Sequence, residues 1–158
     1  MTDSNQTTHS VKHATFTIER TYAAAPARVF TALSTKDAKG KWFSGPAEWT
    51  RSKWELDFRV GGREVSAAGP PGGPEHIFVA QYLDIVENAR ITWSYNMYAD
   101  GQKLSSSLTV VELTAVPDGT KLTFTETGAF FDGHEKPAQR EQGSGWILDA
   151  LGAALLAD

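Results

Sequence analysis

The fold is decided by the C-terminal stretch KPAQREQGSGWILDALGAALLAD, which runs from Lys136 to Asp158. Pro137 suits the first turn of a helix, and apolar residues then recur at helical spacing. These apolar residues are Trp146, Ile147, Leu148, Leu151, Ala154, Leu155 and Leu156. A helix from about Pro137 to Ala157 is roughly 30 Å long at 1.5 Å per residue, which is the width of a small domain. It therefore needs a large surface to cover.

The residues before this helix supply that surface as a series of strands. Residues 90–98 alternate apolar and polar side chains most clearly, and residues 14–22 show the same period of two. Further strands are expected at residues 54–60, 63–68, 76–86, 104–116 and 121–128, separated by turn sequences. Two short helices are expected after the first strand, the first opened by Pro26 and the second capped by Ser34 or Thr35.

These elements predict an α+β fold. Strands joined by tight turns pair antiparallel, and the apolar face of such a sheet needs a cover. We therefore expect a curved antiparallel sheet of about six to seven strands wrapped around the long C-terminal helix. Residues 14–158 form one domain in this scheme, and the polar residues 1–13 form a mobile N-terminal tail.

The amino-acid composition excludes several kinds of partner and chemistry. The chain has 158 residues and a formal net charge of −4, and it has no basic block, so nucleic acid is not an expected partner. The sequence contains no cysteine, which excludes disulfides and thiolate chemistry and is compatible with a reducing compartment. No apolar run reaches the roughly 18 residues that span a bilayer, and the N-terminus has no apolar signal core. We expect a cytoplasmic protein with no membrane partner.

Three stretches carry a resemblance to a known family. They are RTYAAAPARVFTA at residues 20–32, DFRVGG at 57–62, and FTETG at 124–128 together with Arg140-Glu141 and the helix at 146–155. With the order of elements, they resemble the START-like (SRPBCC) superfamily, whose members share the helix-grip fold. Within it, they are most similar to the branch named after the activator of the heat shock protein 90 ATPase. The likeness covers residues 14–157.

The resemblance implies a cavity between the sheet and the long helix, and three kinds of function. The leading expectation is a protein that binds a small, mainly hydrophobic molecule there, with no catalytic residue and no cofactor. The second is a chaperone-interacting domain of the stress response. The third is a cyclase- or hydrolase-type enzyme that uses Glu126 and Arg20. The sequence leaves both a monomer and a homodimer open.

Aromatic residues are the first candidates for the lining of such a cavity. Aromatic side chains also dominate ordinary protein cores, so the set is compatible with either a pocket or a filled interior. The candidate residues are Trp42, Phe58, Phe78, Trp93, Tyr95, Phe124 and Trp146.

Arg20 and Glu126 are the first polar candidates. The resemblance makes the first and last strands neighbours, and both residues lie on faces expected to point inward. We hypothesise a partly buried charge pair, because a lone buried charge is costly. The pair could orient a polar group of a ligand, Glu126 could act as a general base, or the two could form a structural salt bridge. Asp132, Arg140 and Glu141 are further polar candidates near the mouth of the cavity, with a solvated surface as the alternative.

Three glycines in the C-terminal helix are unusual, because each costs about 1 kcal/mol relative to alanine in a helix interior. Gly143, Gly145 and Gly152 leave room for a ligand or a mobile lid, or they mark a kink or a close approach to the sheet. For metal ions, the sequence has no HExxH motif and no carboxylate cluster at ligand spacing, so no metal is expected.

Overall fold

The computed structural model describes residues 8–43, 45–46 and 48–157, and it confirms the predicted fold class. Over this part of the chain the strands and helices follow in the expected order. They are β1 (Val11–Tyr22), α1 (Pro26–Ser34), α2 (Lys36–Lys39), β2 (Thr50–Leu56), β3 (Arg63–Gly69), β4 (His76–Val86), β5 (Arg90–Ala99), β6 (Gln102–Val116), β7 (Gly119–Phe131) and α3 (Pro137–Ala157).

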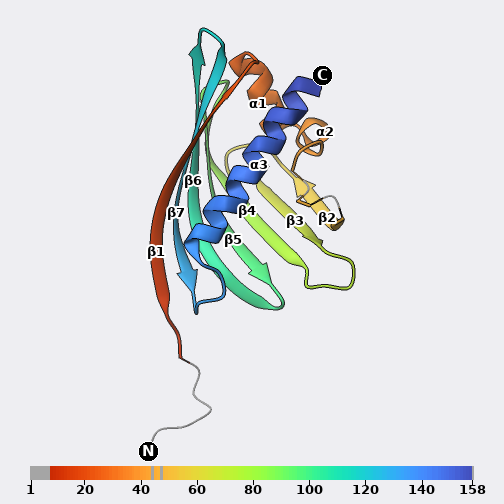
Figure 1. Cartoon of the computed structure of the whole chain (residues 1–158), viewed down its shortest axis with the longest axis vertical. Helices are drawn as coiled ribbons and strands as arrows, with labels where there is room; N and C mark the ends of the chain where they lie inside the picture. The colour runs from red at the N-terminus through yellow and green to blue at the C-terminus, as the bar shows by residue number, and fades with distance from the viewer. Residues whose placement is uncertain (1–7, 44, 47, 158) are drawn as a thin grey trace, which may run out of the picture.

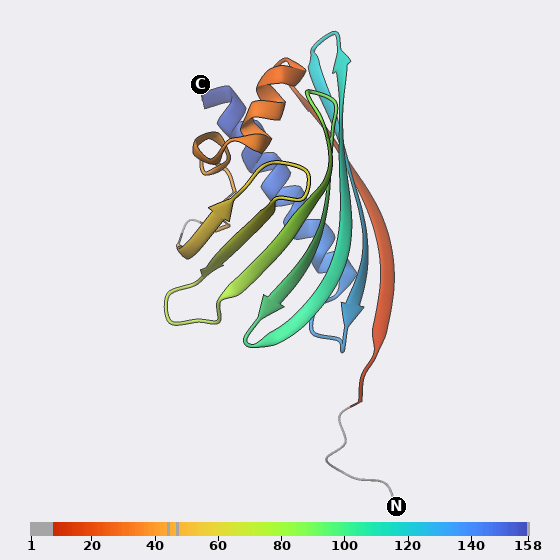
Figure 2. The same ribbon diagram turned by 180° about the vertical axis from the view of Figure 1, so that it is seen from behind.

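The strands form one seven-stranded sheet in the order β1-β7-β6-β5-β4-β3-β2. Every neighbouring pair is antiparallel. The sheet curves around α3, which crosses its concave side, and α1 and α2 lie on that same side (Figures 1 and 2). The first and last strands are neighbours, with Val11 opposite Phe131 and Tyr22 opposite Thr120.

β1 starts earlier than the sequence predicted. It begins at Val11 rather than at Ala14, because residues 11–13 pair with β7. The preceding Ser10 backbone N–H donates to Asp132 Oδ1 at 2.9 Å. The predicted tail of residues 1–13 is therefore wrong at residues 11–13, whereas residues 1–7 lie outside the described part of the chain. Strand pairing uses backbone groups, so the polar side chains there gave no signal for it.

The core lies between α3, α1 and the concave face of the sheet. Its buried apolar residues include Phe16, Ile18, Tyr22, Val29, Leu33, Ile91, Val111, Leu113, Leu122, Phe124, Leu148, Leu151 and Leu155. The buried side of α3 also includes Arg140 and Gly145. The predicted apolar stripe was therefore wrong at two positions, because Trp146 is 66% and Leu156 is 76% exposed.

The helix glycines have different surroundings. A Cβ atom on Gly152 would lie 3.0 Å from Cε1 of Tyr22, whose hydroxyl donates to the Leu148 carbonyl at 2.7 Å. Gly152 therefore permits a close approach of α3 to β1. A Cβ atom on Gly143, by contrast, would meet no heavy atom within 4 Å.

Candidate functional site

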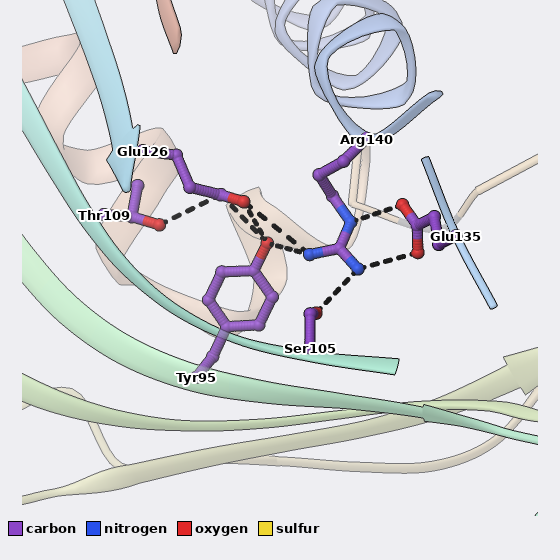
Figure 3. Close-up of polar contacts among 6 residues, drawn as sticks. All are labelled: Tyr95, Ser105, Thr109, Glu126, Glu135 and Arg140. Atoms are coloured by element: carbon purple, nitrogen blue, oxygen red, sulfur yellow. Dashed lines mark hydrogen bonds and ion pairs between the residues drawn. The ribbon is translucent and has the colours of Figure 1, made fainter. Parts of the chain in front are cut away.

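A polar cluster is buried where β5, β6, β7 and the first turns of α3 meet (Figure 3). Thr109 of β6 lies opposite Glu126 of β7, and Tyr95 of β5 lies on the next strand along. Alternate residues of a strand share a face, so these side chains point toward the concave side with the apolar core. Arg140 reaches them from α3, on the helix side that also carries the buried leucines.

Glu126 is the centre of this cluster. Its side chain is only 1% exposed. The Tyr95 hydroxyl lies 2.9 and 2.8 Å from its two carboxylate oxygens, and Thr109 Oγ1 donates to it at 3.2 Å. Arg140 Nη1 donates to the Tyr95 hydroxyl oxygen at 2.8 Å and lies 3.6 Å from Glu126 Oε2. The partners of the carboxylate therefore include one cation and two hydroxyl groups.

The other edge of the Arg140 guanidinium faces the loop between β7 and α3. Nε donates to Glu135 Oε2 at 2.8 Å, and Nη2 donates to Glu135 Oε1 at 2.7 Å. Nη2 also donates to Ser105 Oγ at 2.8 Å. The rings of Tyr95 and Phe130 lie 5.6 and 5.2 Å from the guanidinium carbon, within cation–π range. Arg140 is thus fixed on several sides.

Burial sets the protonation of the cluster. It raises the pKa of Glu126 above its ordinary value, although Arg140, Tyr95 and Thr109 counteract part of this effect. Burial and the neighbouring Glu126 raise the pKa of Tyr95, so the phenol stays protonated. Burial alone would lower the pKa of Arg140, but Tyr95, Glu135 and Glu126 together raise it. The site therefore combines a permanent cation, a neutral phenol and a carboxyl group that protonates more readily than usual.

Aromatic rings continue from this cluster along the concave face. Phe78 lies 4.9 Å from Tyr95, and Trp93 lies 6.3 Å from both Tyr82 and Phe124, between ring centroids. Phe78 and Trp93 are only partly buried. The Nε1 atom of Trp93 is itself buried, and it has no hydrogen-bond partner among the described residues.

Most of the predicted binding residues share this concave face. Tyr95 and Glu126 belong to the polar cluster, and Phe78, Trp93 and Phe124 form the aromatic row beside it. Two more, Phe58 and Trp42, lie in loops on either side of β2 and pack against the same core. Phe58 contacts the ring of Tyr82, and Trp42 is buried and donates from Nε1 to the Ala32 carbonyl at 2.9 Å.

Arg20 and Trp146 do not join the row. The predicted pair of Arg20 and Glu126 is wrong, because Glu126 lies opposite Phe16, four residues further along β1. Four residues of strand span about 13 Å. Arg20 instead donates to Asp149 Oδ1 at 2.7 Å, on the outer side of α3 where Trp146 is also exposed.

The actual partner of Glu126 is Arg140, which the sequence offered only as a polar residue near the cavity mouth. The helical spacing in the sequence nevertheless indicated that Arg140 is buried. The spacing of Arg140 from Leu148, Leu151 and Leu155 places it on the same side of a helix as these leucines. A basic residue on a buried helix side requires a buried acidic partner, and Glu126 is such a residue.

A second buried polar cluster was not predicted. Glu64 is 0% exposed and accepts hydrogen bonds from Lys39 Nζ and the Tyr82 hydroxyl, each at 2.6 Å. Trp54 Nε1 donates to its other oxygen at 3.0 Å. Both carboxylate oxygens are thus satisfied, and the cluster ties α2 to β2, β3 and β4. We assign it a structural role.

The expected cavity between sheet and helix is not confirmed. Two hollows formed by the described residues lie at the surface. One of about 310 Å³ is lined by residues of the β2–β3 hairpin, including Leu56 and Val65. The other, of about 450 Å³, lies between β1 and the outer side of α3, beside Arg20 and Trp146. Neither is lined by Glu126 or Trp93.

The described residues contain neither a helix that could span a membrane nor a cluster that could hold a metal ion. In residues 8–43, 45–46 and 48–157, every helix is too short or too polar to cross a membrane. Within those same ranges, no group of three or more histidine, cysteine, aspartate or glutamate side chains is arranged to hold a metal ion.

The curved sheet closed by one long helix, with a polar cluster buried beneath that helix, defines a START-like domain of the SRPBCC type. The family model described as Activator of Hsp90 ATPase homolog 1-like protein matches residues 23–156. The chain therefore belongs to the family of proteins similar to activator of Hsp90 ATPase homolog 1.

Several solved structures share this fold. A putative uncharacterized protein from Rhizobium leguminosarum is 42% identical, with a TM-score of 0.91 over 96% of this chain and 100% of that one. The Mll3558 protein from Rhizobium loti is 49% identical, with a TM-score of 0.85 over 92% and 99% of the two chains. An AHSA1-like protein from Aeromonas hydrophila, at 23% identity and a TM-score of 0.69 over 91% and 93%, shares the fold. No curated protein sequence matches the chain significantly.

Proposed function

We propose that the protein binds a small, mainly apolar molecule on the concave face of the sheet beneath α3. The family supports a ligand-binding domain in general. The aromatic row would contact the apolar part of the molecule, and the cluster of Tyr95, Glu126 and Arg140 would contact a polar group. We further propose a cytoplasmic location.

The observation that carries the proposal is the indole of Trp93. Its Nε1 is buried but has no acceptor among the described residues. A buried donor without a partner costs about 1–3 kcal/mol, and native proteins retain few of them. An acceptor atom on a bound molecule removes that cost. The ring lies two residues from Tyr95 on the same side of β5, so one small molecule can reach both groups.

We infer that access to this face involves movement of side chains, since neither of the two surface hollows described above is lined by Glu126 or Trp93. Phe78 and Trp93 keep part of their surface exposed, so solvent already reaches the edge of the row. In this proposal the ligand enters from that exposed edge and displaces side chains beneath α3 rather than filling an open cavity.

Calorimetric titration with decanol, an apolar chain with one hydroxyl group, tests the proposal. Trp93→Phe keeps an aromatic ring but removes the Nε1 donor. A neutral hydrogen bond contributes about 0.5–1.5 kcal/mol, so affinity should fall by about two- to tenfold. Trp146→Phe makes the same change on the exposed side of α3 and should leave affinity unchanged. Absence of binding to the unaltered protein, or equal weakening by both variants, would contradict the proposal.

A second candidate function is contact with a chaperone, to which the family's name refers. The specific observation in its favour is Trp146, a large aromatic residue that is 66% exposed beside the hollow between β1 and α3. Exposed tryptophans are enriched at the centres of protein interfaces. Co-purification of a heat shock protein 90 with the unaltered chain, but not with Trp146→Ala, would support this function. Equal recovery with both chains would count against it.

A further inference from the structure

One edge of the Arg140 guanidinium is occupied by a carboxylate from a loop. Glu135 lies between the end of β7 and the start of α3 and accepts from both Nε and Nη2, at 2.8 and 2.7 Å. Two parallel hydrogen bonds to one carboxylate are the arrangement with which arginine binds anionic groups of ligands. Glu135 thus occupies the position that a ligand carboxylate would take.

Glu135 is also where the buried cluster meets solvent. Its side chain is 19% exposed, compared with 8% for Arg140 and 1% for Glu126. Within residues 8–43, 45–46 and 48–157, Glu135 has no hydrogen bond or ion pair other than those to Arg140. Arg140, in contrast, is also held by the Tyr95 hydroxyl and by Ser105. If the pair separates, Glu135 can move into water while Arg140 stays in place.

The charge of Arg140 allows a ligand carboxylate to replace the carboxylate of Glu135. If a carboxylate of a ligand replaces that of Glu135, the guanidinium keeps an anionic partner, and Glu135 regains hydration on the loop. Glu126 does not take over this role, since its nearest oxygen lies 3.6 Å from Nη1, on the opposite edge. A ligand without a negative charge would leave Glu135 where it is.

We propose that Arg140 is the binding site for the carboxylate of an apolar ligand, and that Glu135 is a tethered competitor which this carboxylate displaces. The inference rests on the proposed function, because the apolar part of the ligand lies along the aromatic row. It adds the chemical class of the ligand, a carboxylic acid in its ionised form. It also assigns Glu135 the role of lowering the affinity for that ligand.

The test compares decanoate with decanol, which share a ten-carbon chain and differ in the charged group. Decanoate is ionised at neutral pH. A side chain tethered by a short loop competes at an effective concentration in the millimolar range. Glu135→Gln removes that competing charge and should tighten decanoate binding about tenfold in calorimetric titrations, with decanol unchanged. Glu141→Gln, which removes an exposed charge next to Arg140 in the sequence, should tighten neither.

A second measurement examines the anion site without an apolar tail. In Glu135→Gln, sodium acetate should shift the Nε–Hε resonance of Arg140, whereas the same concentration of sodium chloride should not. An equal gain for decanol, an equal gain from Glu141→Gln, or an unmoved Arg140 resonance would overturn the inference. If acetate shifts the resonance but neither decanol nor decanoate binds, the anion site stands and the proposed function fails.

Discussion

Replacing Arg140 with methionine should destabilise the protein in a way that depends on pH. Methionine keeps an unbranched side chain of similar length but removes the cation. Glu126, which is 1% exposed, then loses its charged partner and keeps the Tyr95 and Thr109 hydroxyl groups. Removing one partner of a buried ion pair costs about 3–5 kcal/mol. Because the two hydroxyl groups remain, we expect a loss of about 3 kcal/mol at pH 8.

The pH dependence follows from the raised pKa of Glu126. A carboxyl group whose pKa is higher in the folded than in the unfolded state stabilises the fold at low pH, and this contribution is lost as the pH rises. Burial already raises the pKa of Glu126, and Arg140 limits that rise. In Arg140→Met the pKa of Glu126 rises further, so protonation at pH 5 should recover part of the lost stability. The loss should therefore be smaller at pH 5 than at pH 8.

Urea unfolding at the two pH values measures both effects. In thermal unfolding, a loss of about 3 kcal/mol corresponds to a drop in Tm of roughly 6–12 °C for a domain of this size. Arg90→Met is the matched control, since Arg90 pairs with Asp84 at 2.6 Å but is half exposed, and exposed ion pairs contribute little to stability. The double variant Arg140→Met/Glu126→Gln should be more stable at pH 8 than Arg140→Met. The reasoning would be refuted if Arg140→Met lost no more unfolding free energy than Arg90→Met, or if it lost the same amount at both pH values.

Three other predictions concern stability. Glu126→Gln should flatten the fall in unfolding free energy as the pH rises above about 4.5, because it removes the carboxyl group whose pKa is raised; urea titrations from pH 4.5 to 8 measure this. Gly143→Ala should stabilise the protein by about 0.5–1 kcal/mol, since nothing lies near its Cβ position, whereas Gly152→Ala should destabilise it against a buried tyrosine ring; thermal unfolding compares the two. Lys39→Met should cost about 3 kcal/mol, because it leaves the fully buried Glu64 without its cation.

Each of these predictions has an outcome that would contradict it. An unchanged pH dependence in Glu126→Gln would show that another group titrates. Equal effects of alanine at Gly143 and Gly152 would mean that the closeness of α3 to β1 has no energetic consequence. A Lys39 variant as stable as the unaltered chain would show that the Glu64 cluster does not hold α2 to the sheet.

The sequence predicted the fold because the signals for it are local. Alternation along residues 90–98 and the long apolar helix starting at Pro137 each specify an element without knowledge of its neighbours. The start of β1 was missed because Lys12 and His13 are polar residues on an edge strand, where pairing depends on the backbone alone. A strand without alternating apolar and polar side chains cannot be recognised from the sequence pattern.

The site was harder to predict because it depends on register and helix rotation. Glu126 and Tyr95 were correctly expected on the concave face, but the partner of Glu126 depends on which residue of β1 lies opposite it, and that residue is Phe16. Trp146 was assigned to the buried side because large apolar residues usually lie there. In the structure Gly145 is buried beside the Arg20 guanidinium instead, and the helix turns Trp146 toward solvent.

The most direct test of ligand binding beneath α3 is the indole N–H resonance of Trp93 during a titration with decanol. If the bound molecule supplies the acceptor that Nε1 lacks, this resonance should shift downfield and saturate, while that of Trp146 on the outer side should not move. Shifts confined to Trp146 and the hollow beside it would contradict the proposed location. An unmoved Trp93 resonance when calorimetry shows binding would do the same.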